Sequence, residues 1–350
     1  MPVPRACCFL IPGDWNTPTG GYTYDRRIVL ALREAGWAVE VRRLDGAWPH
    51  PSASELDAAS ACLGALADDT LVVADGLAFG VLGEVVAPYA KRLHWVALVH
   101  HPLHLETGLS DTAREQLLLS ETRALRHARW VLVTSQHTAV DVAAMGVPPE
   151  RIAVVEPGTD AVAIHAATVR SGPLRLLCVA TLTARKGHSL LLRALAGLIH
   201  LDWALHSVGS TTRDPVTAAG LYALAAPLGE RVFWHGELDA SALQAQYAAA
   251  DVFVLASLHE GYGMVITEAL AHGLPVVASD AGALAQTLPA RAGLQVPAGV
   301  VAPLQAALSR VLSDGALRER LSAGARAAAE QLPSWAVQAA RFATALEAVE

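Results

Sequence analysis

Lysine is nearly missing from this sequence. It occurs only at Lys91 and Lys186 among 350 residues, and arginine carries almost all of the positive charge. Acidic residues outnumber Lys and Arg by 33 to 26, and the resulting net charge of −7 argues against a general nucleic-acid binder. Because lysine is so scarce, each of the two positions is more informative than a lysine usually is.

Cysteines and long apolar runs are also few. The four cysteines, Cys7, Cys8, Cys62 and Cys178, mostly lie in or beside apolar stretches and lack the spacing of a zinc site, so we expect reduced thiols in a cytoplasmic protein. Every apolar run is much shorter than the roughly 18 residues that a membrane-spanning helix needs. No signal peptide is visible either. The sequence therefore predicts a cytoplasmic location, and a peripheral contact at the inner membrane face stays open.

Apolar runs alternate with helical segments along the whole chain. This alternation predicts an α/β protein with mainly parallel sheets of the doubly wound kind. With 350 residues and 53% hydrophobic content, the chain is long enough for two domains that each bury a core. The strands are expected at residues 7–11, 38–44, 70–74, 94–99, 130–134 and 152–155, and then at 174–180, 203–208, 232–234, 252–256 and 275–278.

Residues 251–280 form the most informative stretch. Its apolar run at 252–256 predicts a strand buried on both faces, and a helix is expected at 264–272, where Gly273 ends it. The loop between them holds two glycines within three residues, which lets the backbone approach a ligand closely. The stretch is therefore one unit of strand, loop, helix and strand.

The start of that helix is expected to hold an anion, because its free amides lie at the carboxyl end of the sheet. A phosphate would rest on the amides of Gly263, Met264 and Val265. Two carboxylates bracket the loop, Glu260 and Glu268, and could accept hydrogen bonds from sugar hydroxyls. Taken alone, the pair is better explained by a solvated loop residue at Glu260 and a partner of the helix dipole at Glu268.

With these residues the chain resembles the retaining glycosyltransferases of family 4, the glycosyl transferases group 1, which have the GT-B fold. Its HEGYG loop and EALAHGLPVVASD run are similar to the family's EGFG…EA.A.G.PVV.SD block, and the resemblance extends more thinly over nearly the whole chain. It implies that Glu260 contacts the donor sugar and Glu268 the ribose. Gly261 and Tyr262 would belong to the same donor-binding loop.

The resemblance also implies the domain organisation. Two Rossmann-like, doubly wound domains would face a central cleft, with the acceptor mainly on the first domain and the donor mainly on the second. Residues 161–173 lack a periodic apolar pattern, so we place the domains at 1–165 and 166–333. The C-terminal helix, 334–350, would pack back on the first domain.

A basic loop, TLTARKG at 181–187, follows the strand expected at 174–180. A diphosphate needs such a junction, since helix amides hold its oxygens and a cation neutralises its charge. Lys186 is the stronger candidate for binding phosphate. The chain uses arginine at nearly every other basic position, whereas the lysine ammonium is a compact point charge. Family members usually read G-R-L-x-x-x-K-G, which puts Thr181 where the arginine should be; Arg185 could supply that charge. A solvated loop pair is the alternative.

Three glycines elsewhere match the family more weakly. Gly20 and Gly21 precede a helix expected at 22–35, where family members have a pair facing the donor phosphates and the acceptor. A simple loop geometry would explain the pair as well, and the dinucleotide fingerprint G-x-G-x-x-G is absent. Gly209, at the end of a strand, resembles the family's glycine near the nucleotide.

Asp75 and His100 fall at or just past strand ends, where open α/β sheets place ligand groups. The resemblance implies that one histidine here contacts the donor sugar and helps to place the acceptor. His100 is the better match, His101 is the reserve, and a histidine that merely packs a loop is the alternative. No metal is expected, because the cluster lacks a nearby carboxylate in sequence and the chain lacks HExxH.

The sequence thus predicts transfer of a sugar from a UDP- or GDP-linked donor to a small-molecule, lipid-linked or glycan acceptor, with no cofactor. Retention at the anomeric carbon, in which the leaving phosphate helps to deprotonate the acceptor, is implied by the resemblance. Lys186, Arg185 and the amides near Gly263 would stabilise the leaving diphosphate without a metal. Two alternatives stay open: a nucleotide-sugar epimerase of the same fold, and a catalytically silent binding subunit.

Overall fold

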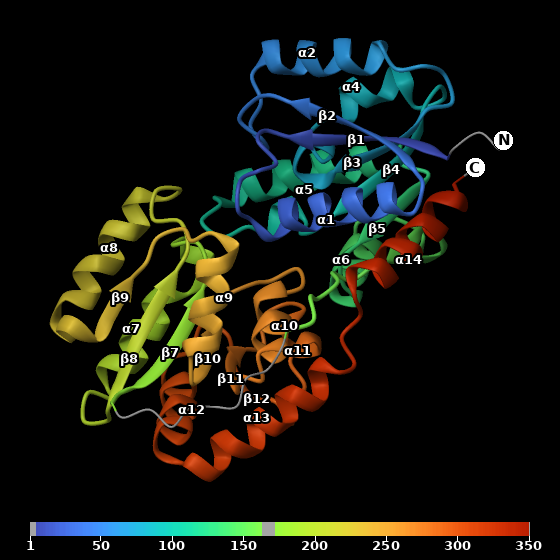
Figure 1. The fold of residues 1–350 in the computed structure, drawn as a ribbon. Helices are drawn as coiled ribbons and strands as arrows, with labels where there is room; N and C mark the ends of the chain where they lie inside the picture. Colours follow the sequence, from blue (N-terminus) through green and yellow to red (C-terminus); the bar gives the residue numbers. More distant parts are fainter. Residues whose placement is uncertain (1–4, 163–171, 350) are drawn as a thin grey trace. The chain divides into compact units, whose positions relative to one another are not determined.

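The computed structural model describes residues 5–162 and 172–349. The chain divides into two compact units, each of which is described by itself (Figure 1). Unit 1 comprises Met1–Gly158 and Pro333–Glu350, and unit 2 comprises Thr159–Leu332. The predicted boundary between residues 165 and 166 lies outside the described residues, and the observed division falls at Gly158.

Unit 1 is built on a parallel sheet of six strands in the order β2-β1-β3-β4-β5-β6. Its strands are rich in β-branched and other apolar residues, as expected of a sheet covered on both faces. They are β1 (Ala6–Pro12), β2 (Ala38–Leu44), β3 (Leu71–Asp75), β4 (His94–Val99), β5 (Trp130–Val133) and β6 (Ile152–Val154). Its α-helices are α1 (Gly20–Glu34), α2 (Ala53–Gly64), α3 (Gly76–Phe79), α4 (Gly83–Val86), α5 (Asp111–Leu125), α6 (Gln136–Ala144) and α14 (Trp335–Glu347).

Two layers of helices cover the unit 1 sheet. On one face α2 to α6 pack against alternate strand residues such as Leu10 and Trp95. On the other face α1 and α14 run side by side (Figure 1). The ring of Phe342 on α14 stacks on Phe9 of β1, with ring centroids 5.9 Å apart. The C-terminal helix is therefore part of the unit 1 core.

Helix α1 begins two residues earlier than the sequence indicates. Thr19 is its N-cap, and the Thr19 hydroxyl accepts a hydrogen bond from the amide of Tyr22 at 3.3 Å. A threonine in this position satisfies one of the free amides of the first turn. Gly20 and Gly21, expected in the preceding loop, are therefore the first residues of the helix.

Unit 2 repeats the architecture with strand order β12-β11-β10-β7-β8-β9, all parallel. Its strands are β7 (Leu174–Val179), β8 (Trp203–Val208), β9 (Val232–Trp234), β10 (Val252–Leu255), β11 (Val276–Ser279) and β12 (Gly293–Val296). Its α-helices are α7 (His188–Ala196), α8 (Pro215–Ala225), α9 (Ala240–Ala249), α10 (Met264–Ala271), α11 (Leu284–Thr287), α12 (Val301–Ser313) and α13 (Gly315–Ala329). The predicted doubly wound α/β class is confirmed in both units, with β12 as an additional strand.

Candidate active site

The basic loop and the glutamate loop of unit 2 lie side by side, because β7 and β10 are neighbours in the sheet. Arg185 and Lys186 stand in a short 3₁₀ helix, η4 (Ala184–Lys186), after β7, and Glu260 stands in the loop after β10. Gly187 closes η4 with φ +66°, and a Cβ there would lie 1.9 Å from the carbonyl oxygen of Ala256. Only glycine permits this close approach.

Glu260 is the centre of an ion-pair cluster. Its Oε1 is 2.5 Å from the Lys186 ammonium nitrogen and accepts a hydrogen bond from the Ser257 hydroxyl at 2.7 Å. Its Oε2 is 3.4 Å from Nη1 of Arg185, which also donates to the carbonyl of His259 at 2.9 Å. The structure thus brings together three predicted site residues.

The charge state of Glu260 follows from these contacts. Burial raises its pKa, since the residue is only 7% exposed, but the charges of Lys186 and Arg185 and the hydrogen bonds from Lys186 and Ser257 outweigh burial and lower the pKa to about 2. Glu260 is therefore an acceptor at every physiological pH. Arg185 and Lys186 reach the same carboxylate, so the two cations act on one region.

Glu268 stands apart from this cluster, on α10, and is held by a tyrosine. The buried hydroxyl of Tyr247 on α9 donates to Oε2 of Glu268 at 2.7 Å, while the Tyr247 ring stacks on Phe253 and His272. Burial raises the pKa of Glu268 to about 7; the Tyr247 hydrogen bond opposes this shift, and the charge of Asp160 adds to it. The carboxyl group is thus close to half ionised near neutral pH.

The first turn of α10 has the geometry predicted for an anion site. Gly263 precedes the helix with φ +88°, and no side chain caps its amides. A Cβ at Gly263 would lie 2.4 Å from Cδ2 of Leu284. The amides of Met264 and Val265 lie in this first turn, where a helix offers no acceptor of its own.

Two further loop positions are fixed by neighbouring groups. The carbonyl of Tyr262, next to Gly261, accepts a hydrogen bond from the Thr287 hydroxyl at 2.7 Å. Gly209, at the end of β8, has φ +146°, and a Cβ there would lie 2.1 Å from the carbonyl oxygen of Ala180. These contacts require glycine at 209 and hold the glycine loop in one shape.

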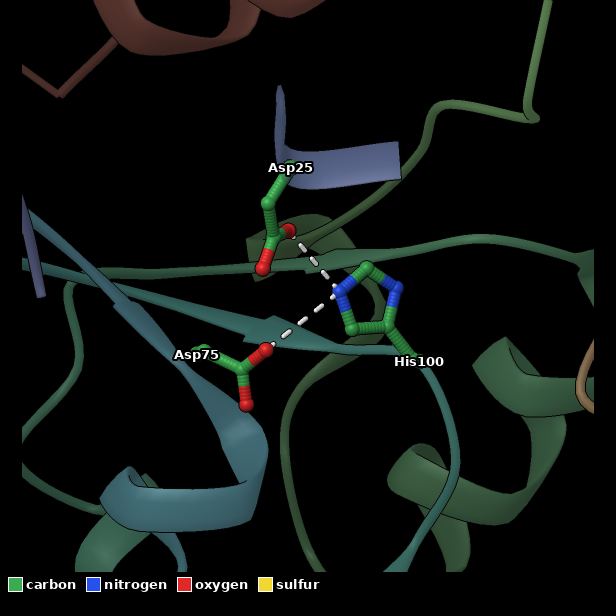
Figure 2. A group of neighbouring side chains, drawn as sticks. All are labelled: Asp25, Asp75 and His100. Atoms are coloured by element: carbon green, nitrogen blue, oxygen red, sulfur yellow. Dashed lines mark hydrogen bonds and ion pairs between the residues drawn. The ribbon is translucent and has the colours of Figure 1, made fainter. Parts of the chain in front are cut away.

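In unit 1, His100 lies between two buried carboxylates. β3 and β4 pair in parallel, so Asp75 at the end of β3 lies near His100, which follows β4. Asp25 reaches the same ring from α1. Nε2 of His100 is 3.0 Å from Oδ1 of Asp25 and 3.6 Å from Oδ2 of Asp75 (Figure 2).

These contacts set the charges of the group. Burial lowers the pKa of His100, but the charge and the hydrogen bond of Asp25 are the main opposing causes and raise the pKa above the ordinary 6.5; a charge on Asp75 contributes least. Burial, followed by the charge of Asp25, raises the pKa of Asp75 to about 8. A cationic histidine between one carboxylate and one carboxylic acid is the state that these shifts favour.

One residue of the predicted glycine pair, Gly21, lies against the ring of His100. A Cβ on Gly21 would lie 3.3 Å from Cδ2 of the imidazole, tighter than most contacts allow. The ring of Tyr24 meets the imidazole edge-on at 5.1 Å, and the Tyr24 hydroxyl donates to the carbonyl of Val155 at 2.8 Å. A larger residue at position 21 would therefore press on the histidine ring, which would have to shift by a few tenths of an ångström.

Asp25, Asp75 and His100 are also the place to consider a cation among the described residues, since their ligand atoms lie within 4.8 Å of one another. The direct 3.0 Å contact between Nε2 and Asp25 is a hydrogen bond. A proton on Nε2 occupies the lone pair that a metal would need. Asp25, Asp75 and His100 thus form a triad in which two carboxyl groups lie beside a histidine that has none nearby in the sequence.

Sequence reasoning missed Asp25 and Tyr247. Asp25 lies one helical turn after the pair Gly20 and Gly21, Tyr247 lies within α9, and neither residue follows a strand end. Asp75 was noted only as a residue at a strand end. His101, the reserve for His100, lies outside the triad.

Comparison with known proteins places this arrangement in a family. A profile described as "Glycosyl transferases group 1" matches residues 173–314. The MMP alpha-(1->4)-mannosyltransferase of Mycolicibacterium hassiacum is 30% identical over 321 residues, which cover 86% of this chain and 75% of that protein. The chain belongs to the group 1 glycosyl transferases. The predicted resemblance is therefore confirmed.

Other relatives of this group 1 transferase agree. The D-inositol 3-phosphate glycosyltransferase of Thermomonospora curvata is 31% identical over 267 residues, and the alignment covers 68% of this chain and 61% of that protein. Among solved structures, sucrose-phosphate synthase of Thermosynechococcus elongatus matches with TM-score 0.82 at 22% identity, covering 99% of both chains. Anabaena HepE, solved with UDP and glucose, matches with TM-score 0.79 at 19% identity over 99% of this chain and 100% of its own. These similarities establish the GT-B fold.

Among the described residues, no helix combines the length and the apolar character that crossing a membrane would require.

Proposed function

We propose that this chain is a retaining glycosyltransferase of family 4 that transfers a sugar from a UDP- or GDP-linked donor without using a metal ion. The observation that carries the proposal is the cluster of Lys186, Arg185 and Glu260 at the carboxyl edge of the unit 2 sheet. Edges of this kind are where open α/β folds bind ligands. Family membership supports the same reaction class.

The donor diphosphate is assigned to the cations and amides of this edge. The Lys186 ammonium has three N–H donors and gives one to Glu260 at 2.5 Å, which leaves two for phosphate oxygens. The amides of Met264 and Val265 lie in the uncapped first turn of α10. Positive charge and oriented amides can stabilise the negative charge that develops on the leaving group, which is the role a metal has in other transferases.

The two glutamates bind different parts of the donor. Glu260, held ionised, accepts hydrogen bonds from hydroxyls of the sugar. Glu268 accepts hydrogen bonds from the ribose hydroxyls, with Tyr247 fixing its Oε2. His100 contacts the sugar and helps to place the acceptor.

The chemical step follows from this placement. The bond between the anomeric carbon and the diphosphate oxygen breaks, and the acceptor oxygen forms its bond on the same face. The acceptor proton passes to the leaving diphosphate, so no separate base is required. The acceptor is a small molecule, a lipid-linked sugar or a glycan. We place the protein in the cytoplasm, with a peripheral contact at the inner membrane face if the acceptor is lipid-linked.

The test starts with thermal unfolding of the purified protein against UDP, GDP, ADP and their common sugar conjugates, with and without magnesium. A shift with one nucleotide family that does not depend on magnesium is expected, since a ligand that binds the native state raises its unfolding temperature. The anomeric configuration of the product, read by NMR, then tests retention. Interconversion of the donor without an acceptor would indicate an epimerase; binding without transfer or hydrolysis would indicate a silent subunit.

Substitutions of the cluster separate binding from transfer. Lys186→Ala and Glu268→Ala should weaken nucleotide binding, whereas Glu260→Gln should spare it and stop transfer. Lys91→Ala is the matched control, because the only other lysine is exposed in unit 1. If titrations and transfer assays show equal and negligible effects for all variants, the assignment of the cluster is wrong.

A further inference from the structure

The triad of unit 1 has one oxygen without a partner. Asp25 is fully buried, its Oδ1 accepts from His100, and its Oδ2 is buried and makes no hydrogen bond within the described residues. In Figure 2 this second oxygen is directed toward the carboxyl group of Asp75. A buried carboxylate oxygen without a donor is costly, so a proton is expected nearby.

The position of that proton is decided by the backbone. The amide of Leu77 donates to Oδ1 of Asp75 at 2.7 Å, so Oδ1 is the acceptor oxygen of this group. Oδ2 of Asp75 is the oxygen that faces His100 and Asp25. A proton on Oδ2 would serve the unpartnered oxygen of Asp25, and the buried triad would then carry one negative and one positive charge.

The free nitrogen of His100 points elsewhere. Nδ1 lies on the side of the ring opposite the carboxylates (Figure 2), and the His100 side chain is 19% exposed. With Nε2–H bound to Asp25, a neutral ring would offer Nδ1 as an acceptor, and a cationic ring offers Nδ1–H as a donor. Which form is present decides what the histidine can do.

We propose that Asp25 and Asp75 are positioning residues that hold His100 as a cation, with Asp25 as its charged partner and Asp75 as a carboxylic acid, so that Nδ1–H is offered to an oxygen of the bound substrate. The inference rests on the proposed function for the identity of that substrate. The raised pKa of His100 agrees with it, and so does the pKa of Asp75, which burial raises to about 8.

The other groups around the ring leave this charge state in place. Tyr24, which meets the imidazole edge-on, has a pKa raised well above 10 by burial and by the charge of Asp25, so its hydroxyl stays neutral. Arg26, next to Asp25 on α1, donates to the carbonyl of Trp15 and interacts electrostatically with Asp25. Among the described residues, the titratable groups that face His100 itself are Asp25 and Tyr24 on α1 and Asp75 on β3.

The first experiment follows the His100 ring by NMR in the protein labelled with ¹⁵N-histidine, without any substrate, and assigns it by its loss in His100→Gln. The ring is expected to titrate above the ordinary 6.5, with Nε2 protonated throughout. A ring that is neutral at pH 6.5, or that is protonated on Nδ1 when neutral, overturns the proposal. This readout does not depend on whether transfer is detected, so its failure is distinct from failure of the proposed function.

Two isosteric variants then separate the carboxyl groups. Asp75→Asn places an amide N–H where the acid proton is proposed, with its oxygen still facing Leu77, so the ring should titrate nearly as in the parent protein. Asp25→Asn removes the charge, so the ring pKa should fall, because one pKa unit changes the ratio of cationic to neutral ring about tenfold. At pH 7.5 kcat should then drop severalfold, with a smaller change in KM.

Equal effects of both substitutions on the ring would contradict the assigned roles. Elemental analysis of the parent protein and both variants provides the remaining check. If the parent holds one divalent metal ion per chain and both variants lose it, a metal ion and not a proton lies between the two carboxylates. That result would overturn the proposal. Thermal unfolding of each variant confirms that it is folded before its ring is titrated.

Discussion

A single buried hydroxyl sets the charge of the proposed ribose-binding group. The Tyr247 hydroxyl donates to Glu268, and this hydrogen bond lowers the pKa of a carboxyl group that burial raises to about 7. The Tyr247 ring is fully buried between Phe253 and His272, so its position does not depend on the hydroxyl. The residue therefore affects function through one oxygen atom.

Tyr247→Phe tests this role. Without the hydroxyl, the pKa of Glu268 should rise further, and the carboxylate that accepts the ribose hydroxyls should form only at higher pH. Nucleotide affinity at pH 7 should fall by about 0.5–1.5 kcal/mol, the usual effect of one hydrogen bond. In the parent protein affinity should increase as the pH rises through about 7, and in the variant this increase should move to higher pH.

Isothermal titration of UDP and GDP between pH 6 and 8.5 measures both effects. Tyr222→Phe is the matched control, because Tyr222 lies exposed on α8 of the same unit. An affinity profile that keeps its midpoint after Tyr247→Phe would show that Glu268 does not control nucleotide binding.

The sequence could locate some of these residues and not others, for a physical reason. Lys186, Arg185 and Glu260 follow strand ends, and the carboxyl ends of parallel strands share one edge of a sheet, so order along the chain indicates proximity. Asp25 and Tyr247 approach from helices. Their contacts depend on how each helix is rotated against its sheet, which a single sequence without a strong motif does not specify.

At the level of elements, Gly187 joins the two loops that form the cation cluster. It ends η4 and precedes α7, with φ +66°, and its Cα faces the carbonyl oxygen of Ala256 after β10. The amide of Leu258 donates to the carbonyl of Arg185 at 2.7 Å across the same junction. The distance between Lys186 and Glu260 thus depends on a backbone contact that only glycine permits.

Gly187→Ala should separate these loops. The added Cβ would lie 1.9 Å from the Ala256 oxygen, and positive φ alone costs a residue with a side chain about 1–3 kcal/mol. We expect a lower unfolding temperature and weaker nucleotide binding together. Gly299→Ala is the control in the same unit, since its φ is +78° but its nearest neighbour would be 3.8 Å away. Equal losses in both variants would mean that φ strain, and not the loop junction, is responsible.

Most strands could be predicted because each is a short apolar run that ends in polar or glycine residues. β12 (Gly293–Val296) was missed, since GLQV is short, begins with glycine and includes a polar residue. Its place in the sheet comes from pairing with β11. The start of α1 was displaced because Thr19 caps a helix that opens with two glycines, residues that sequence reasoning assigns to loops.

At the scale of the whole molecule, buried titratable groups predict how stability depends on pH. Burial is the largest cause that raises the pKa of three carboxyl groups: Asp75 and Glu121 to about 8 and Glu268 to about 7. The stability linked to a raised pKa is complete below the unfolded value and is lost as the pH rises through the folded value. These groups therefore destabilise the protein progressively from their ordinary pKa values, 3.8 for Asp75 and 4.5 for the two glutamates, up to about pH 8.

Buried histidines act in the opposite sense at lower pH. Burial is the main cause that lowers the pKa of His188 and of His206 to about 4, so both are neutral in the native state above that value. Their contribution is complete above the ordinary 6.5 and is lost as the pH falls through 4. Above pH 6.5 the carboxyl groups and His100, whose pKa is raised, all lose stability as the pH rises. We therefore expect the unfolding temperature, measured by calorimetry, to fall from pH 6.5 to about 8.

Glu121 allows this expectation to be tested at one position. It lies on α5 with 1% exposure, accepts from the amide of Leu103 at 2.8 Å through Oε2, and its Oε1 is buried without a hydrogen-bond partner among the described residues. Glu121→Gln keeps the shape of the protonated acid and cannot ionise. The variant should be more stable than the parent at pH 8.5. Its free energy of unfolding should fall less steeply with pH, by the slope that one titrating proton contributes, about 1.4 kcal/mol per pH unit.

Glu115→Gln removes the same charge from an exposed position of α5 and should leave the slope as it is. If both variants change the slope equally, the loss of net negative charge is responsible. If neither does, Glu121 is ionised in the folded protein. In that case the amide of Leu103 binds a carboxylate, and the segment after His100 is held by a charged hydrogen bond, which is stronger than the neutral one that burial favours.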